Sequence, residues 1–126
     1  TVLTKHADII KLREVSGQTA REHKVHFYGF ENPAAVVLIS NDNRNPDGCQ
    51  DASCAAENMM LAAGSYVIGS VWINVLMTLR NKEPAKTLLD GFGIPERHTV
   101  WATLALGYPV SEGIFLQKKA DVVSYI

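Results

Sequence analysis

The side chains most able to do chemistry in this 126-residue sequence are two histidines and two cysteines, namely His23, His26, Cys49 and Cys54. Their spacing fits no standard metal site, and no third or fourth ligand is evident beside them. A Cys–His nucleophilic pair has no supporting local motif. Cys54 lies on an apolar helical segment, where a thiol behaves as a small core residue. The sequence therefore predicts no metal site and no catalytic side chain.

Three aromatic residues, Trp72, Trp101 and Tyr108, could stack on a planar ligand. Aromatic side chains in apolar segments more often belong to a hydrophobic core, and Trp101 is predicted to be a core residue. Trp72 stands beside a glycine–serine turn, so two interpretations stay open for it: a core residue, or part of the lining of a binding pocket.

Composition limits the class of protein. The formal net charge is -1 and the basic residues are scattered, which does not favour binding to nucleic acid or to an anionic membrane. No apolar run is long enough to span a membrane, and residues 1–10 lack the apolar region of a signal peptide. Two cysteines agree with a reducing compartment. We expect a cytoplasmic protein with a single domain over residues 1–126.

Helices and strands alternate along the chain. Apolar spacing predicts a helix over residues 7–22, which Gly17 weakens or breaks, and a central helix packed on both sides that begins at an Asp51 N-cap and ends near Val67. Shorter helices are predicted over 75–79 and 84–90. Strands are predicted over 1–4, 34–39 and 98–106, with a strand-like tail at 118–126 and a surface loop over 41–48. This pattern predicts helices on both faces of a sheet.

Residues 54–73, CAAENMMLAAGSYVIGSVWI, resemble the signature of the nitroreductase family, in which an A-A-x-N-M-x-L-A-A helix leads into a G-S-x-W turn. Further resemblances follow in the family's order at residues 86–95 (KTLLDGFGIP), 100–109 (VWATLALGYP) and 118–126 (KKADVVSYI). Upstream, residues 1–4 and 33–40 match two family strands. Each motif alone is weak, but together they cover essentially the whole chain.

The resemblance implies an α+β fold, a three-layer α/β/α sandwich with a mainly antiparallel central sheet, whose N-terminal part is missing. It also implies the cofactor flavin mononucleotide (FMN), bound at the interface of a homodimer. The implied activity is a ping-pong reaction in which NAD(P)H reduces FMN and a nitroaromatic or quinone then takes the electrons. In such enzymes the cofactor carries the reaction, and the protein binds and orients it.

The resemblance assigns two groups of residues to FMN. Backbone N–H groups of Ile68, Gly69 and Ser70 would face the flavin ring, which approaches closely because glycine lacks a Cβ. The alternative is an ordinary helix-to-strand turn with a C-cap glycine. Lys118 and Lys119 would supply positive charge to the phosphate, or would be a solvated pair before an edge strand.

The sequence departs from the family pattern in two ways that matter. Val67 stands where the family usually has glycine, and the arginine- and serine-rich opening motif that helps hold the FMN phosphate is absent. This absence favours an alternative function, a non-catalytic protein that binds flavin or only dimerises. Specialised chemistry such as reductive dehalogenation or flavin destruction has no residue in its support.

Overall fold

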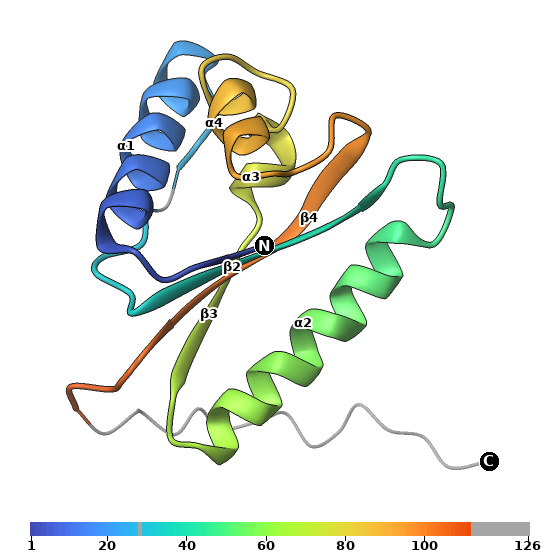
Figure 1. The fold of residues 1–126 in the computed structure, drawn as a ribbon. Coiled ribbons are helices and arrows are strands. Elements are labelled where there is room, and N and C mark those ends of the chain that lie inside the picture. The colour runs from blue at the N-terminus through green and yellow to red at the C-terminus, as the bar shows by residue number, and fades with distance from the viewer. Residues whose placement is uncertain (28, 112–126) are drawn as a thin grey trace, which may run out of the picture.

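An antiparallel sheet forms the middle of the molecule (Figure 1). The structure is a computed structural model and describes residues 1–27 and 29–111. Within these residues the strand order is β1-β2-β4-β3, and every neighbouring pair is antiparallel. The strands are β1 (Val2–Leu3), β2 (Ala35–Asp42), β3 (Gly69–Ile73) and β4 (His98–Gly107). They confirm the strands predicted near residues 1–4, 34–39 and 98–106, while the predicted tail at 118–126 lies outside the described residues.

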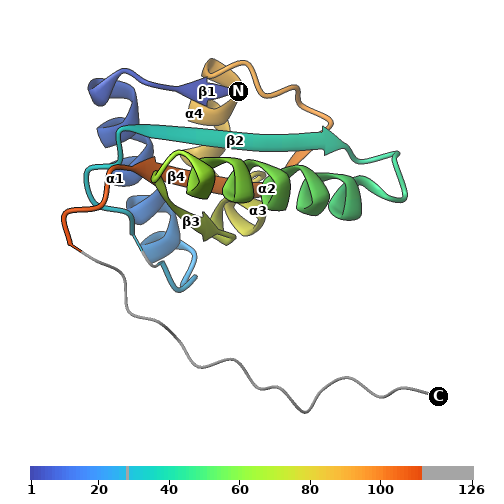
Figure 2. The same cartoon turned by 90° about the horizontal axis from the view of Figure 1, so that it is seen from below.

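Helices cover both faces of the sheet (Figures 1 and 2). One face carries α1 (His6–Glu22), α3 (Val75–Leu79) and α4 (Ala85–Gly91). The opposite face carries α2 (Gly48–Ser65). The predicted three-layer α/β/α architecture with an antiparallel sheet is therefore confirmed.

The continuous apolar run of β2 is buried on both faces, as its composition predicts. Val36 and Leu38 join the larger core cluster beneath α1, α3 and α4, whereas Val37 points the other way and packs with Ala56 of α2. Alternate side chains of one strand thus bind the two helical layers to the same sheet.

Strand β4 contains a bulge at Trp101. Ile39 pairs with Ala102 and Ser40 pairs with Val100, so Trp101 has no partner on β2. The extra residue switches the alternation, and Val100 and Ala102 therefore enter opposite core clusters. Trp101 is only half-buried, and the prediction that it is a core residue was wrong because the bulge displaces it from the regular pleat.

Helix α1 confirms the helix predicted over residues 7–22, and it runs through Gly17 without a break. Gly17 is buried, and a Cβ at this position would lie 3.5 Å from the Phe27 ring. Packing of the aromatic ring over the glycine offsets the propensity cost of about 1 kcal/mol. The helix is joined to α4 by the buried Thr19 hydroxyl, which donates to the Val15 carbonyl at 2.8 Å and accepts from the Ala85 N–H at 3.1 Å.

Helix α2 begins earlier than predicted. Its N-cap is Asp47, and Asp51 lies in its first turn, where the carboxylate accepts a hydrogen bond from the Asn45 side chain at 2.9 Å. The helix packs on the sheet through Ala52, Ala56 and Ala63, and its other side is open: Leu61 is 64% exposed.

Packing on both sides of α2 is therefore not found among residues 1–27 and 29–111. Cys54 is exposed as well, so its predicted place in the core was wrong, because it lies on the open side of the helix. No helix in the described part of the chain is long and apolar enough to cross a membrane.

A buried arginine joins the segments that follow α3. Arg80 is 1% exposed, and its Nε donates to the His98 carbonyl at 3.0 Å. Its Nη2 donates to Asp90 at 2.7 Å and to the Pro95 carbonyl at 2.9 Å. Asp90 also accepts from Lys86 at 2.9 Å. One guanidinium thus connects the end of α3 to α4, to the loop after α4 and to the start of β4.

Candidate functional site

The outer edge of β3 is the place where the predicted site residues meet a cavity. β3 lies at one end of the strand order, and its outer edge pairs with no other strand of the described residues. A free strand edge presents backbone N–H and C=O groups that can bond to a ligand or to another chain. Helix α2 leads directly into this edge through the turn at residues 66–68.

The turn into β3 is a Schellman cap. The Ile68 N–H donates to the Ala63 carbonyl at 2.9 Å, and the Val67 N–H donates to the Gly64 carbonyl at 3.0 Å. Val67 therefore occupies the left-handed position of the motif, with φ of 57°. Glycine is usual at this position because it has no Cβ, whereas a β-branched residue is strained there.

Gly69 and Ser70 are the first two residues of β3, and they lie outside the helix cap. Gly69 pairs with Gly107 of β4, and a Cβ at position 69 would lie 3.3 Å from the Gly107 carbonyl oxygen. The Ile68 N–H is already bonded to the helix. Of the three predicted flavin-facing residues, Gly69 and Ser70 are thus the two that lie on the free strand edge.

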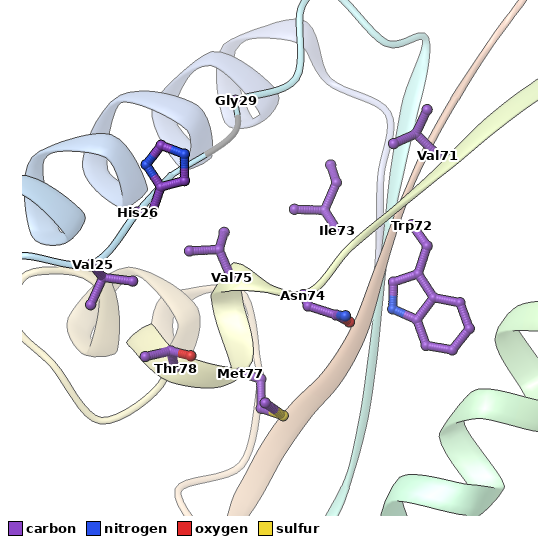
Figure 3. A pocket seen from close by; sticks show the side chains of 10 residues that line it. All are labelled: Val25, His26, Gly29, Val71, Trp72, Ile73, Asn74, Val75, Met77 and Thr78. Atoms are coloured by element: carbon purple, nitrogen blue, oxygen red, sulfur yellow. The ribbon is translucent and has the colours of Figure 1, made fainter.

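Two adjoining cavities lie along this edge, and they share Gly29 and Val71. The larger, of about 710 Å³, is bordered by Gly69 and Ser70, by the end of β4 and by the segment 29–33. The smaller, of about 350 Å³, is shown in Figure 3. Its lining comes from β3, from the start of α3 and from the segment after α1, and comprises Val25, His26, Gly29, Val71, Trp72, Ile73, Asn74, Val75, Met77 and Thr78.

Trp72 borders the smaller cavity, in agreement with the interpretation that it lines a pocket. Figure 3 shows its indole on the α2 side of β3, while Ile73 and Val75 lie on the opposite side. The indole also packs against the smaller core cluster, so Trp72 belongs to both the core and the cavity wall. Its buried Nε1 has no hydrogen-bond partner within the described residues.

The two cavities are apolar and almost uncharged. Val71, Trp72, Ile73, Val75 and Met77 provide the apolar surface of the smaller one. His26, Glu31 and Tyr108 are the titratable side chains in the two linings, and neither lining includes a lysine or arginine. Lys118 and Lys119, predicted to meet the phosphate, lie outside the described residues.

The shifted pKa values lie away from the cavities. A hydrogen bond from Lys86, with further help from Arg80, holds the pKa of Asp90 below its ordinary value. Arg44, through its side-chain hydrogen bond, does the same to the pKa of Asp42. Both carboxylates stabilise loops and helix ends, and neither borders the cavities. No group of metal-binding side chains is found in the part of the chain that the structure describes.

The sequence analysis missed the wall contributed by α3. Asn74 and Thr78 both border the smaller cavity, and their side chains make no hydrogen bond within the described residues. Their spacing of four residues could have indicated a shared helical face. That the face meets a cavity depends on the distant segment 25–29, which sequence spacing does not reveal.

Two curated proteins match parts of this chain in sequence. A protein of Archaeoglobus fulgidus, named as a candidate NADH dehydrogenase/NAD(P)H nitroreductase, is 43% identical over 68 residues, covering 54% of this chain and 37% of its own. A protein of Methanothermobacter thermautotrophicus with the same name is 27% identical over 107 residues, covering 82% of this chain and 54% of its own. The chain thus spans about half or less of the length of these curated relatives.

A solved structure shows the same fold at full coverage. The crystal structure of a nitroreductase with bound FMN from Bacteroides fragilis superposes with a TM-score of 0.84 at 28% identity, covering 100% of this chain and 74% of that one. The model of the nitroreductase family matches residues 5–108, which include every helix and all strands but β1 of the described structure. With the sheet, the capped helix and the β3 edge in place, the match shows that this chain belongs to the nitroreductase family.

Proposed function

We propose that the chain is part of an FMN-dependent oxidoreductase that transfers electrons from NAD(P)H to a nitroaromatic or quinone-type acceptor in a ping-pong reaction. The observation that carries the proposal is the position of Gly69 and Ser70 on the free edge of β3, beside a cavity of about 710 Å³. The FMN bound by the Bacteroides fragilis relative and the names of the two curated relatives support the same activity.

The residues present fit the ring end of FMN. The cavities along the strand edge offer apolar side chains such as Val71 and Ile73, and the edge offers backbone groups that can bond to a heterocycle. At Gly69 the absent Cβ leaves the backbone open to close approach. When bound, FMN supplies the redox chemistry, accepting two electrons from NAD(P)H and giving them to the acceptor.

The protein's part in this reaction is binding and orientation. The Gly69–Ser70 edge would hold one side of the ring. The walls from α3 and from Val25, His26 and Gly29 would exclude water from it. The phosphate needs positive charge, which neither described lining provides. We assign that role to Lys118 and Lys119.

The flavin is proposed to lie at the interface of a homodimer in the cytoplasm. Leu61, which is 64% exposed on the open side of α2, is the apolar side chain that supports dimer formation. An alternative function is a non-catalytic protein that binds flavin or only dimerises. The lack of a described lysine or arginine around the cavities favours this alternative.

The first test is an anaerobic visible spectrum of the chain with added FMN, before and after NAD(P)H. Bound flavin that bleaches with NAD(P)H and recovers when a nitroaromatic or quinone is added supports the oxidoreductase. Flavin that binds but resists reduction supports the non-catalytic alternative. If FMN shows no saturable binding, the proposal fails for this chain.

Substitutions then locate the site. Gly69→Val is expected to weaken FMN binding at least about tenfold, because the added side chain occupies the space of the ring and approaches the Gly107 carbonyl. The matched control is Gly64→Val, at an exposed glycine where an added Cβ meets no atom within 4 Å. Replacement of both Lys118 and Lys119 by Gln should also weaken binding, and more so at low salt. Equal affinities of the Gly69 and Gly64 variants would place the flavin elsewhere.

A further inference from the structure

The short helix α3 forms one wall of the smaller cavity but cannot hold its own position. It spans only Val75–Leu79, and helices of this length are unstable in isolation. Its inner face is fixed by Leu76 and Leu79, which are fully buried. Its outer face carries Met77 and Thr78 into the cavity lining. The position of this cavity wall therefore depends on the contacts that attach α3 to the rest of the chain.

Arg80 is the polar attachment of α3. It follows the last residue of the helix, and its guanidinium bonds to the His98 carbonyl, the Pro95 carbonyl and the Asp90 carboxylate. The acceptors come from the start of β4, from the loop after α4 and from α4 itself. Arg80 is not part of the lining of either cavity along β3.

We propose that Arg80 is a positioning residue for the smaller cavity: it fixes the α3 wall in place without touching a ligand. Only arginine can donate to all three acceptors at once, because its planar guanidinium donates from Nε and from Nη2 at fixed angles. Lysine keeps the charge toward Asp90 but cannot reach the carbonyls of His98 and Pro95 at the same time. Loss of the guanidinium should therefore loosen α3 while the sheet stays folded.

The test introduces Arg80→Lys into the chain and measures amide hydrogen exchange without any ligand. We expect exchange in α3 to rise about tenfold while exchange in α2, on the opposite face of the sheet, stays unchanged. Unchanged exchange in α3, or an equal rise in α2, would overturn the proposal.

A matched control separates positioning from general stability. Thr19→Val removes the buried hydroxyl bond between α1 and α4, and Thr19 borders neither cavity along β3. If Thr19→Val, with a similar loss of thermal stability, raises exchange in α3 to the same extent, Arg80 has no special role. Asp90→Asn provides a milder variant should Arg80→Lys fail to fold, since it keeps the guanidinium and its carbonyl bonds. Its effects should lie between those of the parent and those expected for Arg80→Lys.

The effect on ligand affinity rests on the proposed function. If FMN binds, Arg80→Lys should weaken its binding about tenfold, with the control near the parent value. An unchanged affinity in a variant with a loosened α3 would show that the wall does not contribute to FMN binding and would overturn that part of the proposal. If FMN does not bind to the parent chain, the proposed function fails, whereas hydrogen exchange in α3 still decides the role of Arg80.

Discussion

At the scale of single residues, Val67 is the clearest point of strain. Its φ of 57° is a left-handed conformation that a β-branched residue adopts only at a cost, and its side chain is 72% exposed, so little packing offsets that cost. Val67→Gly should raise the free energy of unfolding by roughly 1 kcal/mol, measured by urea denaturation. Tyr66→Gly is the control, because Tyr66 has a negative φ and gains no relief. A lower stability for Val67→Gly would refute this account of the cap.

Thr19 is the residue whose polar group matters most inside the helical layer. Its hydroxyl is fully buried and accepts the Ala85 N–H at 3.1 Å. Thr19→Val keeps the shape but leaves that N–H without a partner, so the free energy of unfolding should fall by about 1–3 kcal/mol. Thr19→Ser retains the hydroxyl and should lose less. Equal losses in calorimetric or urea measurements would mean that the methyl group, not the hydrogen bond, stabilises this junction.

At the scale of elements, the junction of α3, α4 and β4 depends on pH through Asp90. Lys86 and Arg80 lower the pKa of Asp90 below 3.8, so its contribution to stability is complete above about pH 4 and is lost as the pH falls through the lowered value. The free energy of unfolding of the parent should therefore fall on acidification more steeply than that of Asp90→Asn. Denaturant titrations from pH 6 to pH 2 measure both slopes, and parallel curves would contradict the ion-pair account.

Elements with a strong local pattern were predictable from the sequence. The apolar run of β2 and the span of α3 follow from residue types alone. The start of α2 was misplaced because Asp47 and Asp51 are both suitable N-caps, and in the folded chain Asp51 lies within the first turn and accepts a hydrogen bond from Asn45. The β4 bulge could not be predicted, since it depends on how Trp101 meets a partner strand far away in the sequence.

The site residues were predictable only where they lie in one contiguous segment of the sequence. Gly69 and Ser70 could be found from the resemblance of one contiguous segment to the family. The other wall of the cavities comes from Val25, His26 and residues 29–33, which reach β3 only through the folded topology. The cap offered one local signal, since Val67 departs from the family's glycine at the position that proves to be left-handed.

At the scale of the whole molecule, the open side of α2 predicts association. Leu61 lies there with 64% of its surface exposed, and a homodimer would bury it. Leu61→Asp should shift a dimer toward monomer and weaken FMN binding with it, as measured by sedimentation velocity and by flavin titration. Asn81→Asp, at an exposed position after α3, is the control for the added charge. A monomeric parent chain, or a dimer unaffected by Leu61→Asp, would exclude this interface.

The strand order has a consequence for biosynthesis. β2 and β3 lie on either side of β4, yet β4 is the last strand of the described chain to be made. Until residue 107 has left the ribosome, neither β2 nor β3 can pair with β4. The apolar faces of β2 therefore cannot yet be buried in the complete sheet. A nascent chain that pauses within α4 would expose those faces, so assistance from chaperones would matter most during synthesis of the last strand.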